Sequence, residues 1–178
     1  MTPAALGIPM LETDRLRLRG PEARDWPTYS EFFGDAEASR FYGGPLRPEQ
    51  AWKRLAQDIG HWALRGYGIW IVELQESGQA IGGTGLHWAE GWPRRELTWW
   101  LTAEARGHGY ALEASRAAIE HAVRRLGWDP VETHMADDNA PARALALRLG
   151  GRVIAREPFP DGLWRDVYAL PAIQEGTA

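Results

Sequence analysis

The stretch Arg106-Gly107-His108-Gly109-Tyr110-Ala111 lies between an apolar, strand-like run and an alanine-rich segment of helical periodicity. Two glycines around one residue let the backbone turn tightly, and no Cβ then blocks the approach of a ligand to its N–H groups. The positive end of the following helix dipole adds to these donors. We therefore expect an anion site for a phosphate or pyrophosphate at this turn.

Two common phosphate-binding turns fit this stretch poorly. A P-loop needs Lys and Ser/Thr after its last glycine, where this chain has Tyr110 and Ala111, so nucleoside triphosphate hydrolysis is not expected. A dinucleotide-binding turn needs a third glycine where Leu112 stands, although Glu132 follows at the spacing of its ribose-binding acid. A nicotinamide-dependent oxidoreductase therefore stays an alternative, as does a turn whose glycines serve only a tight connection.

Composition narrows the class of protein. The 178 residues suit one domain, 1–178, with ends at 1–10 and 172–178 that we expect to be frayed. The net charge of −4 comes without a basic run, which argues against a nucleic acid partner. The absence of cysteine excludes disulfides, a thiol nucleophile and thiolate metal sites. Since no signal peptide or membrane-spanning run is visible, we expect a cytoplasmic protein without membrane contact.

Apolar periodicity predicts alternating strands and helices. We expect strands at 11–19, 67–74, 79–88, 94–102, 131–135, 152–156 and 164–170. We expect helices at 22–33, 48–64, 111–126 and 139–149. Pro48 suits a helix start, whereas Gly66, Gly127 and Gly150 suit helix ends. This order predicts an α/β domain whose helices pack on the faces of a mixed sheet.

A short signature and four segments in order along the chain resemble one protein family. Arg106-x-x-Gly109-x-Ala111 is similar to the Arg/Gln-x-x-Gly-x-Gly/Ala signature of the GNAT acetyltransferase superfamily. Further segments resemble its ribosomal-protein-alanine (Rim-type) N-acetyltransferase branch: the opening strand at 12–19, the strand at 96–106, Tyr110-Ala111-x-Glu113-Ala114, and Asn139 placed eleven residues before Gly150. Together these matches are more specific than the short signature alone.

The resemblance implies a fold, a reaction and a donor. The expected fold is a mixed, mostly antiparallel sheet of about seven strands flanked by helices, with a splayed V between the fourth and fifth strands, at 94–102 and 131–135. The expected reaction is direct transfer of an acetyl group from acetyl-CoA to a primary amine. The resemblance assigns the acetyl-CoA site to main-chain groups around Leu101 and Thr102, to the turn residues Arg106, Gly107, His108, Gly109, Tyr110 and Ala111, and to Asn139.

Glu96 is the proposed general base, directly or through a water molecule, and His87 is a second candidate. A strand carboxylate facing a cleft is expected to have a raised pKa, although Glu96 can equally pair with Arg94 or Arg95. The remaining histidines, His61, His121 and His134, show no ligand spacing, so no metal is expected. Ala146 stands where many relatives carry a tyrosine general acid, which leaves the proton donor to the thiolate unidentified.

The acceptor is less well defined by the sequence. Phe41, Tyr42, Trp88 and Trp100 are candidate substrate-binding residues, since aromatic walls suit an apolar or cationic amine. The net negative charge of the chain favours a small cationic amine as the acceptor, whereas the resemblance implies a protein N-terminus as the acceptor. The alternative in another class is a non-catalytic acyl-CoA-binding or sensor domain. We expect a monomer or a homodimer.

Overall fold

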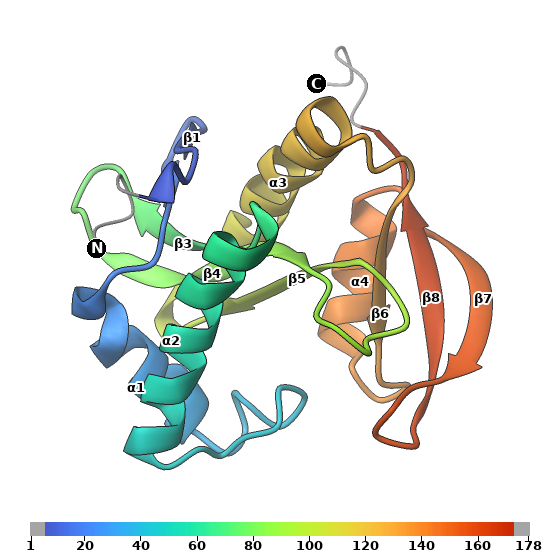
Figure 1. The fold of residues 1–178 in the computed structure, drawn as a ribbon, viewed down its shortest axis with the longest axis horizontal. Coiled ribbons are helices and arrows are strands. Elements are labelled where there is room, and N and C mark those ends of the chain that lie inside the picture. The colour runs from blue at the N-terminus through green and yellow to red at the C-terminus, as the bar shows by residue number, and fades with distance from the viewer. Residues whose placement is uncertain (1–5, 173–178) are drawn as a thin grey trace.

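The computed structural model describes residues 6–172 (Figure 1). The helices are η2 (Ala23–Asp25), α1 (Trp26–Gly34), α2 (Pro48–Arg65), η3 (Ala103–Ala105), α3 (Tyr110–Leu126) and α4 (Ala140–Arg148). The strands are β1 (Leu11–Glu12), β2 (Leu16–Arg19), β3 (Ile69–Leu74), β4 (Ala80–His87), β5 (Glu96–Leu101), β6 (Val131–Met135), β7 (Arg152–Pro158) and β8 (Trp164–Leu170). Over these residues, no helix is both long and apolar enough to span a bilayer.

The strands form two antiparallel sheets that part between β5 and β6. One sheet has the order β1-β2-β3-β4-β5 and the other has the order β6-β8-β7. A side chain crosses the boundary, because Thr133 Oγ1 on β6 donates to the Leu97 carbonyl on β5 at 2.9 Å. The splayed gap expected between the strands at 94–102 and 131–135 is therefore confirmed.

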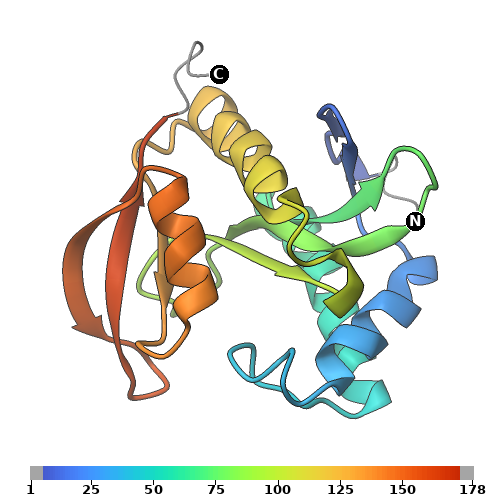
Figure 2. The same cartoon turned by 180° about the vertical axis from the view of Figure 1, so that it is seen from behind.

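Helices cover both faces of the larger sheet (Figures 1 and 2). Strand alternation sends Ile71 and Trp100 to the face covered by α1 and α2, and Trp70 and Val72 to the face covered by α3. Gly83 makes room for the indole on the first face, since a Cβ there would lie 2.7 Å from Trp100 Nε1. These two apolar layers hold β5 firmly at the edge of the gap.

Two predicted segments differ from the structure. The expected strand at 11–19 is a hairpin, because Thr13 N donates to the Leu16 carbonyl at 3.0 Å and β1 folds back on β2. Turn-forming Thr and Asp explain this break. Part of the segment expected to fray is held, since Trp70 Nε1 donates to the Pro9 carbonyl at 2.8 Å and Ile8 packs on the core. Residues 1–5 and 173–178 of the expected frayed ends lie outside the described residues.

Candidate functional site

The glycine turn has the conformation of an anion cradle. Gly107 and Gly109 both have φ of +80°, a left-handed conformation that strongly favours glycine. Gly109 is the N-cap of α3, whose first-turn N–H groups have no partner within the helix. A Cβ at Gly107 would meet no atom within 4 Å, so conformation rather than crowding calls for glycine there. The turn therefore presents N–H donors at a positive helix end.

A clamp fixes the start of α3 to the first hairpin. Glu113 accepts hydrogen bonds from Thr13 Oγ1 at 2.6 Å and from Arg15 Nε at 2.7 Å. Arg15 also donates to the His108 carbonyl at 3.0 Å and lies 4.6 Å from the centre of the Tyr110 ring. Burial acts to raise the pKa of Glu113, but the bonds from Thr13 and Arg15 outweigh it and lower that pKa. Two of the sequence segments thus meet and hold the cradle in place.

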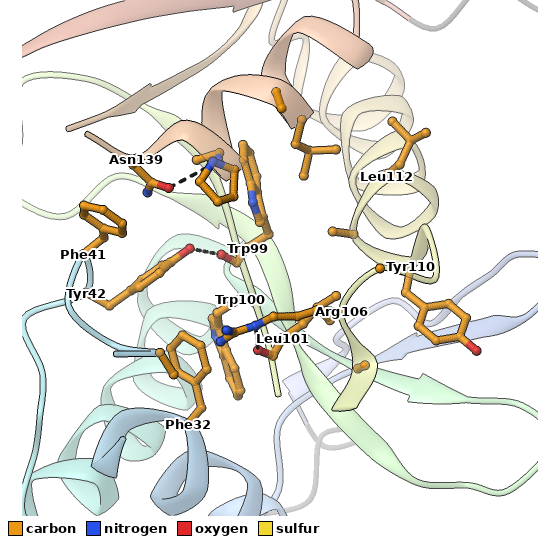
Figure 3. Close-up of a pocket in the computed structure, with 18 of the residues that line it drawn as sticks. Phe32, Phe41, Tyr42, Trp99, Trp100, Leu101, Arg106, Tyr110, Leu112 and Asn139 are labelled. Carbon is orange, nitrogen blue, oxygen red and sulfur yellow. Dashed lines mark hydrogen bonds between the residues drawn. The ribbon is translucent and has the colours of Figure 1, made fainter. Parts of the chain in front are cut away.

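A first cavity, of about 390 Å³, opens between this turn, β5, α4 and the segment between α1 and α2 (Figure 3). The predicted donor-binding residues that line it are Leu101, Arg106, Gly107, Gly109, Tyr110, Ala111 and Asn139. Thr102 and His108 are not among its lining residues. His108 lies on the exposed side of the turn, with its ring stacked on Tyr110.

The main chain of β5 explains the different places of Leu101 and Thr102. The carbonyls of Leu97, Trp99 and Leu101 accept side-chain hydrogen bonds from groups outside β4, so these alternate residues turn their polar groups toward the gap. Thr102 N instead donates to the Ile81 carbonyl at 2.9 Å. The backbone at Leu101 and Trp99 therefore faces the gap, and the Thr102 amide does not. Trp99 was not among the predicted donor-binding residues, although it lies inside the strand predicted at 94–102.

The polar side chains of the first cavity are already oriented. Arg106 Nε donates to the Leu101 carbonyl at 3.2 Å, which holds its guanidinium against β5 (Figure 3). Asn139 Oδ1 accepts from Ala142 N at 3.2 Å and so caps α4. The Tyr110 ring points away from the cavity in Figure 3, so this residue contributes its backbone. The cavity thus combines helix-start amides and the buried Asn139 side-chain amide with the guanidinium groups of Arg40, Arg106 and Arg148 and the carboxylate of Glu37.

A second cavity, of about 500 Å³, meets the first at the gap between the sheets. Both are lined by Arg40, Phe41, Tyr42, Trp99, Asn139 and Ala142. Tyr42 stands at this junction, where its hydroxyl donates to the Trp99 carbonyl (Figure 3). Burial and the charge of Glu96 raise the pKa of Tyr42 well above its usual value, so the hydroxyl stays a donor. The two cavities therefore adjoin and share these lining residues.

Glu96 lies in the second cavity between two histidines. His134 Nε2 contacts one carboxylate oxygen, and His87 Nδ1 lies 3.5 Å from the other. Neither expected arginine pairs with it: Arg94 binds Glu132 and Glu157 instead. Burial acts to raise the pKa of Glu96, but hydrogen bonds and charge from the two imidazoles outweigh it. The pKa of Glu96 is therefore lowered, and the expected raised value is wrong.

The candidate aromatic residues occupy different environments. Phe41 and Tyr42 line both cavities, whereas Trp100 lines the first and packs against Phe32, with ring centroids 4.9 Å apart. Trp88 is 42 % exposed, lies outside both cavities and donates through Nε1 to the Trp92 carbonyl. Trp92 and Trp99 are the tryptophans of the second cavity.

His134 is the site residue that sequence reasoning overlooked. It was judged only for metal spacing, and within residues 6–172 no cluster of three or more metal-ligating side chains occurs. Its one visible signal was its position on the strand predicted to border the gap. That strand brings His134 onto Glu96, which is far away in the sequence.

The fold and the paired cavities define a class of protein, and comparison with known families agrees. Residues 15–152 match the family described as Acetyltransferase (GNAT) domain. The chain therefore belongs to the GNAT acetyltransferase family.

Individual relatives extend this assignment. The crystal structure of an acetyltransferase from Agrobacterium tumefaciens str. C58 is 32 % identical, with a TM-score of 0.82 over 90 % of this chain and 93 % of that one. The uncharacterized protein YkkB of Bacillus subtilis (strain 168) is 28 % identical over 79 % of this chain and 83 % of its own. RimL, a ribosomal L7/L12 alpha-N-protein acetyltransferase solved with coenzyme A, shares the fold at 18 % identity, with a TM-score of 0.74 over 92 % and 98 %.

Proposed function

We propose that this chain is an acetyl-CoA-dependent N-acetyltransferase that transfers the acetyl group directly to a primary amine. The observation that carries the proposal is the pair of cavities joined at the β5–β6 gap, with an anion cradle in one and the Glu96 carboxylate in the other. Direct transfer needs both substrates held in line at one point. The junction at Tyr42 and Trp99 provides such a point.

The donor fits the first cavity. The amides of 107–111 suit the pyrophosphate, and the nearby guanidinium of Arg106 suits its charge. The pantetheine arm is proposed to run along the main chain of Leu101 and Trp99, with Asn139 as a further hydrogen-bonding group. The RimL structure with coenzyme A supports a donor of this kind, since it shares the fold.

The acceptor belongs in the second cavity, against Phe41 and Tyr42. A protein N-terminus, as in the Rim-type branch, and a small cationic amine are the two proposed acceptor classes. The lining includes Arg40, Arg54 and Arg165, so the acidic balance of the chain is not concentrated there. This lining weakens the electrostatic case for a strongly cationic amine. The cytoplasmic location and the monomeric or dimeric state stay predictions.

Binding and transfer are tested separately. Calorimetry with acetyl-CoA, CoA, NAD and ATP is expected to show binding of the first two, and binding of NAD alone would contradict the family's donor chemistry. Release of free CoA is then measured with polyamines, amino acids and peptides of varied N-terminus. Turnover with a primary amine supports the enzyme. Tight acetyl-CoA binding without turnover on any amine would favour the acyl-CoA sensor.

A further inference from the structure

Glu96 brings together two histidines from opposite sides of the gap. His87 is the last residue of β4 in the larger sheet, and His134 lies on β6 in the smaller one. One carboxylate oxygen contacts His134 Nε2 and the other lies 3.5 Å from His87 Nδ1. All three side chains line the second cavity. The carboxylate therefore links two imidazoles at the place proposed for the acceptor.

The two imidazole rings are not equivalent. The His134 side chain is 8 % exposed, its ring packs 4.1 Å from that of Phe159 between centroids, and its Nδ1 is buried. Neither of its nitrogens is therefore open to a substrate. The His87 side chain is 18 % exposed, and its Nδ1 is turned to the carboxylate. Its second nitrogen, Nε2, is separated from Nδ1 by the Cε1 carbon, so the contact of Nδ1 with Glu96 leaves Nε2 for another partner.

Carboxylates and a third imidazole lie around these two rings. Three groups lie near His87. Glu96 faces it from β5, and the ring of His61 on α2 is stacked on the His87 ring with centroids 5.1 Å apart. The charge of Asp58 lies further away. His61 has a pKa lowered to about 4, chiefly by burial, so it stays neutral near pH 7.

His134 lies between Glu96 and the charge of Glu157 on β7. A carboxylate oxygen of Glu96 therefore lies beside each ring, an arrangement similar to the carboxylate–imidazole pairs of hydrolases.

Building on the proposed function, we propose that His87 accepts the acceptor's proton through Nε2, that Glu96 orients and stabilises the resulting imidazolium, and that His134 is a positioning residue that fixes Glu96. A carboxylate held ionised is a poor proton acceptor near pH 7, whereas an imidazole ordinarily has a pKa of about 6.5. The positions of the three side chains and the ordinary basicity of an imidazole therefore both favour His87, rather than Glu96, as the proton acceptor.

The proposed step is balanced as follows. The acceptor ammonium gives one proton to His87 Nε2, and the free amine attacks the thioester carbonyl carbon. The C–N bond forms and the C–S bond breaks. A second proton from the amine nitrogen passes to the leaving sulfur, which departs as the CoA thiol. The imidazolium then returns its proton to water, so each turnover releases amide, thiol and one proton.

The coupling is tested first without any substrate. Histidine ring signals are titrated by NMR in the whole protein and in Glu96→Gln, with Glu120→Gln on the surface of α3 as the control. Loss of the bridging charge is expected to lower the pKa of both the His87 and the His134 ring, and the control is expected to lower neither. Unchanged titration of both rings in Glu96→Gln would overturn the proposed linkage.

The division of roles is tested by kinetics with an amine that the wild type acetylates. His87→Gln is expected to lose about 10²-fold or more in kcat, with the KM for acetyl-CoA unchanged and the acid limb near the imidazole range lost. His134→Gln keeps a side-chain N–H near the position of Nε2, so it is expected to retain more activity than His134→Ala. Near-normal rates in His87→Gln would make Glu96 the base itself.

The two proposals fail in different ways. A wild-type chain that binds acetyl-CoA but acetylates no amine, with the ring coupling intact, would refute the proposed reaction and with it the role of His87 as base. An active enzyme whose two rings titrate independently of Glu96 would refute the linkage alone. An active enzyme in which His134→Ala keeps the wild-type rate and pH profile would refute the positioning role.

Discussion

Replacing Glu113 with Gln removes the charge that ties the first turn of α3 to the first hairpin. The carboxylate accepts from Thr13 Oγ1 at 2.6 Å and from the Arg15 backbone N at 3.0 Å, and it forms an ion pair with the Arg15 guanidinium at 2.6 Å. Gln keeps the shape and one acceptor, so the substitution tests the charge rather than the packing. We expect a less stable protein and weaker acetyl-CoA binding, because Arg15 also holds the His108 carbonyl.

The expected loss of unfolding free energy depends on how exposed the Arg15 side chain is. Hydrogen bonds to a charged group contribute about 1.5–3 kcal/mol each, but the Arg15 side chain is 49 % exposed and solvent screens its part. A total loss of about 1–2 kcal/mol is therefore expected at pH 7. For a chain of this length, each kcal/mol shifts Tm by about 2–4 °C. The variant should unfold several degrees below the wild type.

The pH dependence gives the sharper test. The pKa of Glu113 is lowered in the folded state from its ordinary 4.5, so its stabilisation is complete above that value and is lost as pH falls through the folded pKa. Thermal unfolding from pH 7 to pH 3 should show the gap between wild type and Glu113→Gln closing only at acid pH. Glu120→Gln, which breaks a surface pair with Arg124, serves as the control. Equal Tm values for the two variants, or a gap that does not narrow as the pH is lowered, would refute the clamp.

Four further substitutions test other parts of the molecule. Trp100→Ala should cost about 3–5 kcal/mol in urea unfolding, since the indole is buried against α1, and a loss below about 1 kcal/mol would contradict that packing. Gly109→Ala strains a residue with φ of +80° by about 1–2 kcal/mol and should weaken acetyl-CoA binding severalfold by calorimetry. Gly127→Ala, with φ of +66° at the other end of α3, should lose stability without losing affinity. Wild type should lose stability as pH falls from 6.5 to about 4, because His61 is held neutral when folded; His61→Gln should lose less over that range, and equal losses would contradict its burial.

Local rules predicted the framework of the fold. Pro48 begins α2 as expected, and Gly66 and Gly127 end α2 and α3 with positive φ. The strands β6 and β8 have the predicted bounds, Val131–Met135 and Trp164–Leu170, and each lies between turn-forming residues. The gap between the sheets was available only through the resemblance, since no local pattern distinguishes a splayed strand pair from a bonded one.

The partners of the site residues could not be predicted in the same way. Period-two alternation places Glu96 on a face of its strand, but its contact with His134 depends on how β6 lies across the gap. The same limit applies to Trp99 and Trp100. Alternation puts them on opposite faces, whereas only the packing of α1 decides that Trp100 is buried and Trp99 borders both cavities.

The two proposed substrate sites draw in part on different segments of the chain. The anion cradle is built by the end of β5 and the start of α3, whereas the walls of the second cavity include the segment between α1 and α2 and the β7–β8 hairpin. The segment between α1 and α2 lines both cavities, whereas the turn between β7 and β8 lines the second cavity and not the first. Surface turns of this kind tolerate insertion and exchange. Grafting the β7–β8 turn from a relative should therefore change the preference for the acceptor amine while the proposed donor site stays intact.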